Sequence, residues 1–510
     1  MTIQFRHIFR TAFICGALGF ASCDKFLEER PSKTSALEVK TADQLEALLN
    51  AHASFYSESN RYAIYSTDDY GLKAEMYKAA RTPFNLTGIQ CALWDTRYLP
   101  DDTRDGFWTN EYKKIFTANM VLSLVESVSG TAEQKASLTA DAHFIRAYSY
   151  FQLANTYALP YTDASKNEPG VPIKLSTSFD EPMARAPLEK VYQQIESDLS
   201  EALKTTVPLV QNGRARHWRA STTGVKGFAA RYYLTRGNYA EALKYAQAAL
   251  DEYGTLVDYN TEMRYGRTQS LVVNPGTPEV KTVVLQYPYT HDNQIDQTDM
   301  LGWKEFLYFR MLSHDSWWYL PSEALLSLYD KDHDLRYRYH MVEGYSYDRS
   351  MINPGYDYPG YVFFFKDRMP SGPTVAEMLL TKAEALARSG KPADAMAALN
   401  QLRAKRMEPG SWVNLSATSN DDAIAKVLQE RRREMPFVHR WMDIRRFNSN
   451  DYPNDDVSLS RSFFPYNSAA VQTNEAEKTY TLPKDSRRFA TPIPQTEIIA
   501  SNGQIQQNKY

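Results

Sequence analysis

The chain has 510 residues, a formal net charge of −3 at pH 7, and 13% aromatic residues. This length allows one large domain or several ordinary ones, and a pI of about 6.4 excludes the overall basic field of most nucleic-acid-binding proteins. The 35 tyrosines and 8 tryptophans combine flat apolar faces with polar tips, which suits surfaces that bind other molecules, sugar rings among them.

The first 22 residues are typical of a secretory signal. A positively charged start precedes an apolar stretch at 11–20, which is shorter than the roughly 20 residues that span a bilayer. Residues 18–23, LGFASC, resemble the bacterial lipobox, in which the chain is cut before the cysteine and the thiol is acylated. We therefore predict a signal peptide over 1–22 and a lipid on Cys23 that ties the protein to a membrane. The alternative is an ordinary signal peptide with a chance cysteine at the cut.

Cysteine usage agrees with an anchor. Cys15 would leave with the signal and Cys23 would carry the lipid, so only Cys91 remains. A lone thiol cannot form an internal disulfide, and the fold must depend on its core.

Helices are predicted through the first half of the chain. Residues 23–40 are polar and predict a tether, and a scaffold of helices then extends over 41–254, beginning at Thr41 as a candidate N-cap. Further helices are expected at about 108–128, 131–157 and 187–203. The first of these places Tyr112, Ile115, Phe116, Met120 and Leu124 on one stripe.

Two segments resemble each other, residues 223–250 and 373–406. Each reads as a helix, a glycine turn (Gly237 or Gly390) and a second helix with an alanine five residues after the glycine. Small residues there let antiparallel helices approach closely, as in tetratricopeptide pairs. Such pairs stack into a scaffold with a concave face.

The residue composition changes on either side of the second helical pair. Residues 255–371 are rich in proline, glycine, asparagine and tyrosine, with one strand candidate at 282–287, and predict a loop-rich ligand-binding lobe. The scaffold continues over 372–447, and an irregular C-terminal segment follows over 448–510. The predicted fold class is mainly α, a tetratricopeptide-like helical-pair scaffold that carries a loop-rich, aromatic-rich lobe with few strands.

Catalytic motifs are missing from the sequence. It has no phosphate loop, nucleophile elbow or zinc helix. Residues 330–334, DKDHD, start like a calcium loop, but Leu335 and Met341 replace the required glycine and glutamate. We predict no metal, no cofactor and no enzyme activity. A secreted hydrolase stays an alternative, because its paired carboxylates could come from any of 61 acidic residues.

A dense charge cluster fills residues 430–446, ERRREMPFVHRWMDIRR. It could be an anion-binding patch, but its acidic and basic residues alternate at helical spacing, which favours mutual pairing. This segment also closely resembles the signature helix of the SusD/RagB family of outer-membrane lipoproteins. Other matches to the family, in the expected order from residue 22 to 508, are SCDKFLE at 22–28, Phe107-Trp108 with Tyr112, Ile115 and Asn119, Arg146-Ala147-Tyr148, PIPQTEI at 492–498, and Gln507-Asn508.

This resemblance implies a cell-surface lipoprotein of the outer membrane that captures a nutrient for a SusC-like TonB-dependent transporter. Members of the family usually bind oligosaccharides, the RagB branch resembles a peptide binder, and neither hydrolyses its ligand. Glycan binding is our leading hypothesis; a peptide-binding importer subunit and a scaffold for protein assembly are alternatives.

The ligand site in this family is built from loop aromatics with polar partners. Residues 94–98, WDTRY, lie where starch-binding members keep an aromatic side chain, and they offer two rings beside a cation. The lobe could add an opposing aromatic wall, and two adjacent acids could accept hydrogen bonds from sugar hydroxyls. The candidate ligand contacts are Trp94, Arg97, Tyr98, Trp303, Tyr308, Asp68 and Asp69. For each aromatic, burial in the core is the alternative.

Overall fold

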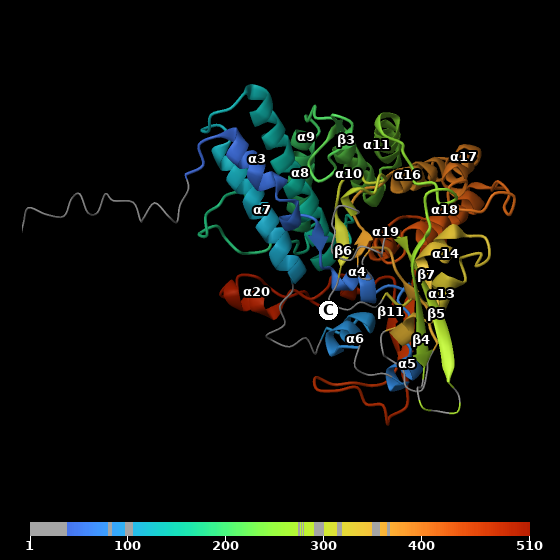
Figure 1. Cartoon of the computed structure of the whole chain (residues 1–510). Coiled ribbons are helices and arrows are strands. Elements are labelled where there is room, and N and C mark those ends of the chain that lie inside the picture. The colour runs from blue at the N-terminus through green and yellow to red at the C-terminus, as the bar shows by residue number, and fades with distance from the viewer. Residues whose placement is uncertain are drawn as a thin grey trace, which may run out of the picture.

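A computed structural model describes residues 38–79, 84–96, 106–273, 276, 278, 280–289, 300–313, 319–348, 357–364 and 368–510 (Figure 1). The predicted signal peptide, Cys23 and the ligand candidates Arg97 and Tyr98 lie outside these residues.

The four helices predicted in the first half are confirmed as α3 (Ala42–Asn50), α7 (Gly106–Leu124), α8 (Ala132–Tyr157) and α9 (Leu188–Ala202). Helix α3 starts at Thr41 and α8 at Thr131, and each N-cap exchanges hydrogen bonds with a glutamine three residues on. This capping box satisfies two backbone donors that a helix start would otherwise leave free. Helices α7, α8 and α9 pack in sequence order, with α3 against α8 (Figure 1).

The two helical pairs are also present. They are α10 (Thr222–Thr235) with α11 (Tyr239–Glu252), and α16 (Val375–Arg388) with α17 (Pro392–Arg403). Gly237 and Gly390 have φ of +70° and +77°, a left-handed conformation that glycine adopts without steric cost. The alanines five residues later, Ala242 and Ala395, are fully buried. Helix α11 packs on α16, so pairs far apart in sequence form one layer, which α18 (Asn420–Glu434) and α19 (Arg440–Phe447) extend.

Strands occur in small sheets. The predicted strand is β5 (Lys281–Pro288), antiparallel to β4 (Tyr265–Val273). A three-stranded sheet joins β1 (Ser57–Glu58), β6 (Met311–Ser313) and β9 (Arg368–Pro370). Further antiparallel pairs of strands among the described residues are β2 (Val210–Gln211) with β3 (Arg214–Ala215), β7 (Met341–Val342) with β8 (Gly360–Tyr361), and β10 (Leu459–Phe463) with β11 (Lys478–Leu482).

The β10–β11 hairpin differs from our expectation of an irregular C-terminal segment. Each strand is only five residues long, too short for its alternation to stand out from the surrounding prolines. The described residues also include the short helices α4 (Arg61–Tyr65), α5 (Ala74–Ala79), α6 (Leu86–Ala92), α13 (Glu323–Leu326), α14 (Leu335–His340), α15 (Tyr345–Asp348) and α20 (Gln495–Ala500), with 3-10 turns at His52–Ser54, Pro453–Asp455 and Arg487–Phe489.

Tyrosine and phenylalanine contribute many of the large side chains of the core. The largest hydrophobic cluster joins residues 62–93 of the N-terminal part to the lobe and to residues 437–466. A second cluster fills the space between α7, α8, α9 and α10. Many tyrosines are completely buried, among them Tyr148, Tyr150, Tyr157, Tyr232, Tyr259, Tyr287, Tyr308 and Tyr319. Much of the high aromatic content therefore holds the fold together.

The charged segment 430–446 forms an interior ion-pair network. Glu430 of α18 lies 2.7 Å from Arg336, 3.1 Å from Arg403 and 2.8 Å from Arg433. Burial raises the pKa of Glu430, but these three arginines outweigh it and hold the pKa at about 2. In α19, Arg446 pairs with Glu384 and Asp443 in the same way. The predicted pairing within the segment occurs between Glu430 and Arg433 and between Asp443 and both Arg431 and Arg446, but most of the partners lie on other elements.

Candidate ligand-binding groove

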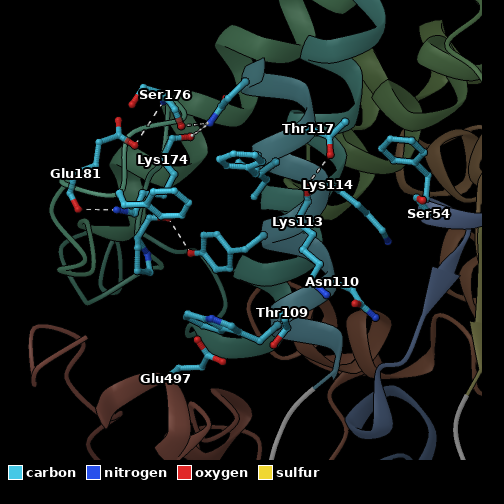
Figure 2. Close-up of a pocket in the computed structure, with 18 of the residues that line it drawn as sticks. Ser54, Thr109, Asn110, Lys113, Lys114, Thr117, Lys174, Ser176, Glu181 and Glu497 are labelled. Carbon is cyan, nitrogen blue, oxygen red and sulfur yellow. Dashed lines mark hydrogen bonds between the residues drawn. The ribbon is translucent and has the colours of Figure 1, made fainter. Parts of the chain in front are cut away.

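A groove of about 740 Å³ follows helix α7. Residues 53–57 border it on one side and the loop 172–183 on the other, and Glu497 of α20 lies near one end. In Figure 2, Ser54 stands on one side of the helix, and Lys174, Ser176 and Glu181 stand on the other. This volume lies within the range of about 300–1,000 Å³ that is usual for small-molecule sites.

Aromatic rings line the groove. Trp108 and Tyr112 lie with ring centroids 5.0 Å apart, and Phe116 stacks on Phe179 of the facing loop at 6.1 Å with 22° between the ring planes. Phe116 is 38% exposed and Phe179 is 89% exposed. Along the stripe predicted on this helix, Ile115 is buried, whereas the ring of Phe116 is part of the groove surface.

The facing loop is held against α7 by hydrogen bonds. Asn119 donates its side-chain amide to the carbonyls of Lys174 and Ser176 at 3.0 and 3.1 Å, and the Tyr112 hydroxyl donates to the carbonyl of Pro172 at 2.8 Å. Within the loop, the Lys174 ammonium donates to the backbone carbonyl of Glu181 at 2.6 Å (Figure 2). A groove whose walls are already tied together loses less conformational freedom when a ligand binds.

Two neighbouring lysines of α7 differ in role. Lys114 is buried, pairs with Glu111 and donates to the carbonyl of Ser57 at 2.9 Å. Burial raises the pKa of Glu111, although the charge of Lys114 opposes this shift. Lys113 is exposed at the groove, and its ammonium has no hydrogen-bond or ion-pair partner among the residues that the structure describes. Lys113 is therefore a hydrogen-bond donor that is free for a ligand.

The aromatic candidates from the sequence that can be located are core residues. Trp94 is 5% exposed, and its indole N–H donates to the carbonyl of Ser66 at 2.8 Å. Trp303 packs against Phe363 and Phe364 in the lobe, and Tyr308, 1% exposed, packs against Phe144 and Tyr148 of α8, among others. Because protein covers these rings, the expectation that Trp94, Trp303 and Tyr308 contact ligand does not fit their placement.

The two acidic candidates belong to the ion-pair network. Arg440 donates to both oxygens of Asp68 at 2.7 and 2.8 Å, and Asp69 accepts from Arg432 at 2.5 Å and from the backbone of Phe437 at 2.9 Å. Burial raises the pKa of Asp68, but the charge and hydrogen bonds of Arg440 hold it at about 2. These carboxylates hold α18 and α19 in place, which corrects their expected role as acceptors for sugar hydroxyls.

The groove was missed in the sequence although a weak signal existed. Phe179 is an isolated aromatic in the polar stretch STSFDEP (176–182), where a buried contact is hard to account for. None of the located candidates lines the groove, and Arg97 and Tyr98 stay predictions.

The groove can bind a ligand through ring faces, lysine and amide groups. Across the described part of the chain, there is no cluster of three or more histidine, cysteine or acidic residues that could hold a metal ion. Within the same residues, no helix has both the length and the apolar character needed to cross a membrane.

Two family models match this chain, one at each end. A SusD-like model described as starch-binding and associating with the outer membrane matches residues 25–234, which include every groove residue except Glu497. A model described as the SusD family matches residues 375–510, which include both α18 and α19.

Similar proteins extend the likeness across the chain. SusD-like protein P2 of Formosa agariphila is 24% identical over 98% of this chain and 99% of its own length. A SusD-like protein of Bacteroides ovatus is 30% identical over 44% of this chain and 38% of its own.

Among solved structures, a putative sugar-binding protein of Bacteroides vulgatus has a TM-score of 0.60 at 19% identity, covering 93% of this chain and 99% of that one. A laminarin-binding SusD-like protein has a TM-score of 0.55 at 18% identity, covering 92% and 99%. The matched fold, the two family models and the full-length relative together place this chain in the SusD/RagB family of outer-membrane-associated, carbohydrate-binding proteins.

Proposed function

We propose that this protein captures a glycan at the outer membrane, where a lipid on Cys23 anchors it, and passes the glycan unchanged to a SusC-like TonB-dependent transporter. The observation that carries the proposal is the match of residues 25–234 to the starch-binding, outer-membrane-associated family model, because the α7 groove is built almost entirely from this stretch.

The chemistry of the groove supports a glycan ligand. Exposed ring faces on Phe116 and Phe179 suit the apolar faces of sugar rings, and the free ammonium of Lys113 suits their hydroxyls. The groove is open along one helix, as a polymeric ligand requires. A tether at Cys23 would keep the protein at a high local concentration over its transporter, so that a modest interface suffices.

A peptide ligand is the second candidate. The observation in its favour is the exposure of Phe179 at 89% beside a half-exposed Phe116, an apolar pair that would also accept hydrophobic side chains of a peptide. Peptide binding would keep the same location and transporter and change only the class of nutrient.

A binding screen of the chain without its signal tests the ligand class. Titration calorimetry against neutral and acidic polysaccharides and against peptides should find affinity for a glycan. Phe116→Ala and Phe179→Ala should each weaken that affinity about tenfold, the effect of losing about 1.4 kcal/mol of stacking. The matched control is Tyr265→Ala, a residue of β4 that is also 38% exposed and lies outside the groove.

The outcomes separate the alternatives. Binding of peptides alone would replace the glycan with a peptide, and any product released from a bound ligand would contradict a non-enzymatic role. For the anchor, Cys23→Ser should move the protein out of the membrane fraction and abolish labelling by a palmitate analogue. Co-purification of the wild-type protein with a TonB-dependent transporter tests the partner.

A further inference from the structure

A second cavity, of about 560 Å³, lies where the two helical pairs meet the signature segment. It is lined by Tyr161, the end of α10 with the turn that follows (234–239), the end of α16 (387–388), the start of α18 (420–424) and the end of α19 with the residues after it (446–452). These helices lie together in the upper right of Figure 1. The cavity shares no lining residue with the α7 groove.

Arg236, the C-cap of α10, is the central feature of this cavity. Its guanidinium lies 3.7 Å from the ring centroid of Tyr161 and 5.0 Å from that of Tyr192. A cation is favoured at a helix C-terminus, and stacking on a ring holds the plane of the guanidinium. Within the described part of the chain, the guanidinium of Arg236 has no hydrogen-bond or ion-pair partner, so its side-chain donors stay available, while its backbone N–H closes the last turn of α10.

The other two arginines of the cavity are neutralised by the protein. Arg388 donates to Glu384 at 2.8 Å and also pairs with Asp455. Arg446 pairs with Glu384 at 2.5 Å and with Asp443 at 2.9 Å. Each of the three arginines lies at the end of a helix. Among the described residues, Arg388 and Arg446 are paired with carboxylates of the protein, and Arg236 is not. A planar fork of this kind binds a carboxylate through two parallel hydrogen bonds.

Groups that can bind hydroxyls line the same cavity as this cation. The hydroxyls of Tyr161 and Tyr239 have no hydrogen-bond partner among the described residues, whereas the Tyr452 hydroxyl donates to Asp421 at 2.8 Å. Asp421 and Asp451 present exposed carboxylates to the same cavity. Two carboxylates repel a polyanion such as a phosphorylated or heavily sulfated ligand, but they accept hydrogen bonds from neutral hydroxyls.

We propose that this cavity binds a uronic acid, or a uronic acid unit of a glycan, with its carboxylate on Arg236 and its hydroxyls on the tyrosine and aspartate side chains. The inference rests on the proposed function in that it names an acidic class of glycan. It concerns a separate site, so the two can fail independently.

Titration of the signal-free chain with glucuronic acid and with digalacturonic acid tests the site, with glucose and maltose as neutral probes. The acids should bind and the neutral sugars should not bind at this site. Arg236→Gln should weaken acid binding at least tenfold, and Tyr239→Phe, which removes only a hydroxyl, should weaken it a few-fold. The control is Arg214→Gln, an exposed arginine of β3 outside both cavities, which should leave binding unchanged.

Three results would overturn the proposal. They are equal binding of glucuronic acid and glucose, unchanged acid binding by Arg236→Gln, and binding of inorganic phosphate as tight as that of the uronic acid. Unfolding temperatures of both variants within a few degrees of the wild type show that a loss of binding is local. Retained uronate binding by Phe116→Ala places it outside the α7 groove. If glycan binding depends on Phe116 but not on Arg236, the proposed function stands and this site falls.

Discussion

The segment 430–446 is rich in charged side chains and helix α7 is rich in aromatic ones, and the two regions use these side chains differently. In the segment, Glu430, Arg431 and Arg446 are buried and paired, and their partners come from α14, α16, α17 and α19. In α7, Lys114 is paired inside the protein while Lys113 and Phe116 face the groove. The most charged motif of the chain is thus internal, whereas the groove exposes the ring of Phe116 and the ammonium of Lys113.

This difference follows from the cost of burying charge. A buried ion needs several partners to offset its lost hydration, so a dense cluster of interior charges must converge on one place and hold many elements together. A ligand surface keeps donors and rings unpaired until the ligand arrives. Changes in the network should therefore reduce stability, and changes in the groove should reduce binding.

The largest effect is expected for Glu430→Gln. This change leaves Arg336, Arg403 and Arg433 without their shared carboxylate, and removing one partner of a buried ion pair costs about 3–5 kcal/mol. Urea unfolding measures the loss. The control is Glu323→Gln, which breaks an equally short pair with Lys73 at a side chain that is 79% exposed, and it should cost about 1 kcal/mol or less. Equal losses of unfolding free energy in the two variants would contradict the idea that the buried pairs stabilise the fold more than exposed pairs do.

The second-largest effect is expected from acid, which should lower the free energy of unfolding by protonating buried histidines. Burial lowers the pKa of His340 from 6.5 to about 4, and the ring is held neutral between the Tyr259 hydroxyl at 3.0 Å and the Val362 carbonyl at 2.9 Å. As the pH falls, His340 takes up a proton in the unfolded state before it does so in the folded state. The contribution of neutral His340 to the free energy of unfolding is therefore complete above pH 6.5 and falls as the pH drops toward 4.

The expected loss for His340 is about 2 kcal/mol between pH 8 and pH 5. Unfolding free energies at the two pH values measure it, and His340→Gln should show a decrease that is smaller by this amount. Burial also lowers the pKa of His217 to about 4, so His217→Gln should behave in the same way and the double variant should add both effects. A pH dependence that neither variant changes would rule out these two groups as its source.

A smaller effect is expected for Trp94→Phe. The variant keeps an aromatic ring but loses the indole hydrogen bond to Ser66, which costs about 1 kcal/mol of unfolding free energy. Glycan affinity should be unchanged, because the Trp94 ring is covered. A loss of affinity without a loss of stability would instead return the ligand site to residues 94–98.

The smallest change in stability is expected for Phe179→Ser. The ring is 89% exposed, so the unfolding free energy should stay within about 0.5 kcal/mol of the wild type. The same preparation should bind glycan about tenfold more weakly. Destabilisation by more than about 1 kcal/mol would mean that Phe179 supports the loop 172–183 rather than a ligand.

The sequence predicted the helical scaffold well, because helix starts and turns are local. The neighbouring residues are enough to identify the helix N-caps Thr41 and Thr131 and the turn residues Gly237 and Gly390. The site was predicted poorly for the opposite reason. The sequence shows that Asp69 is acidic and that Trp94 is aromatic. It does not show whether such a side chain contacts a ligand or another part of the protein, because the contacting residues can be far apart in the sequence.

The sequence by itself thus determined the order of the helices, the paired repeats and the family, since caps, apolar periodicity and motif order are properties of neighbouring residues. Only the tertiary structure decided which charges and rings are used up inside the protein. Arg432 meets Asp69, and Arg440 meets Asp68, across more than half of the chain. The same contacts leave the Lys113 ammonium and the Arg236 guanidinium without an ion-pair partner among the described residues, and for this reason both belong to the sites that we propose.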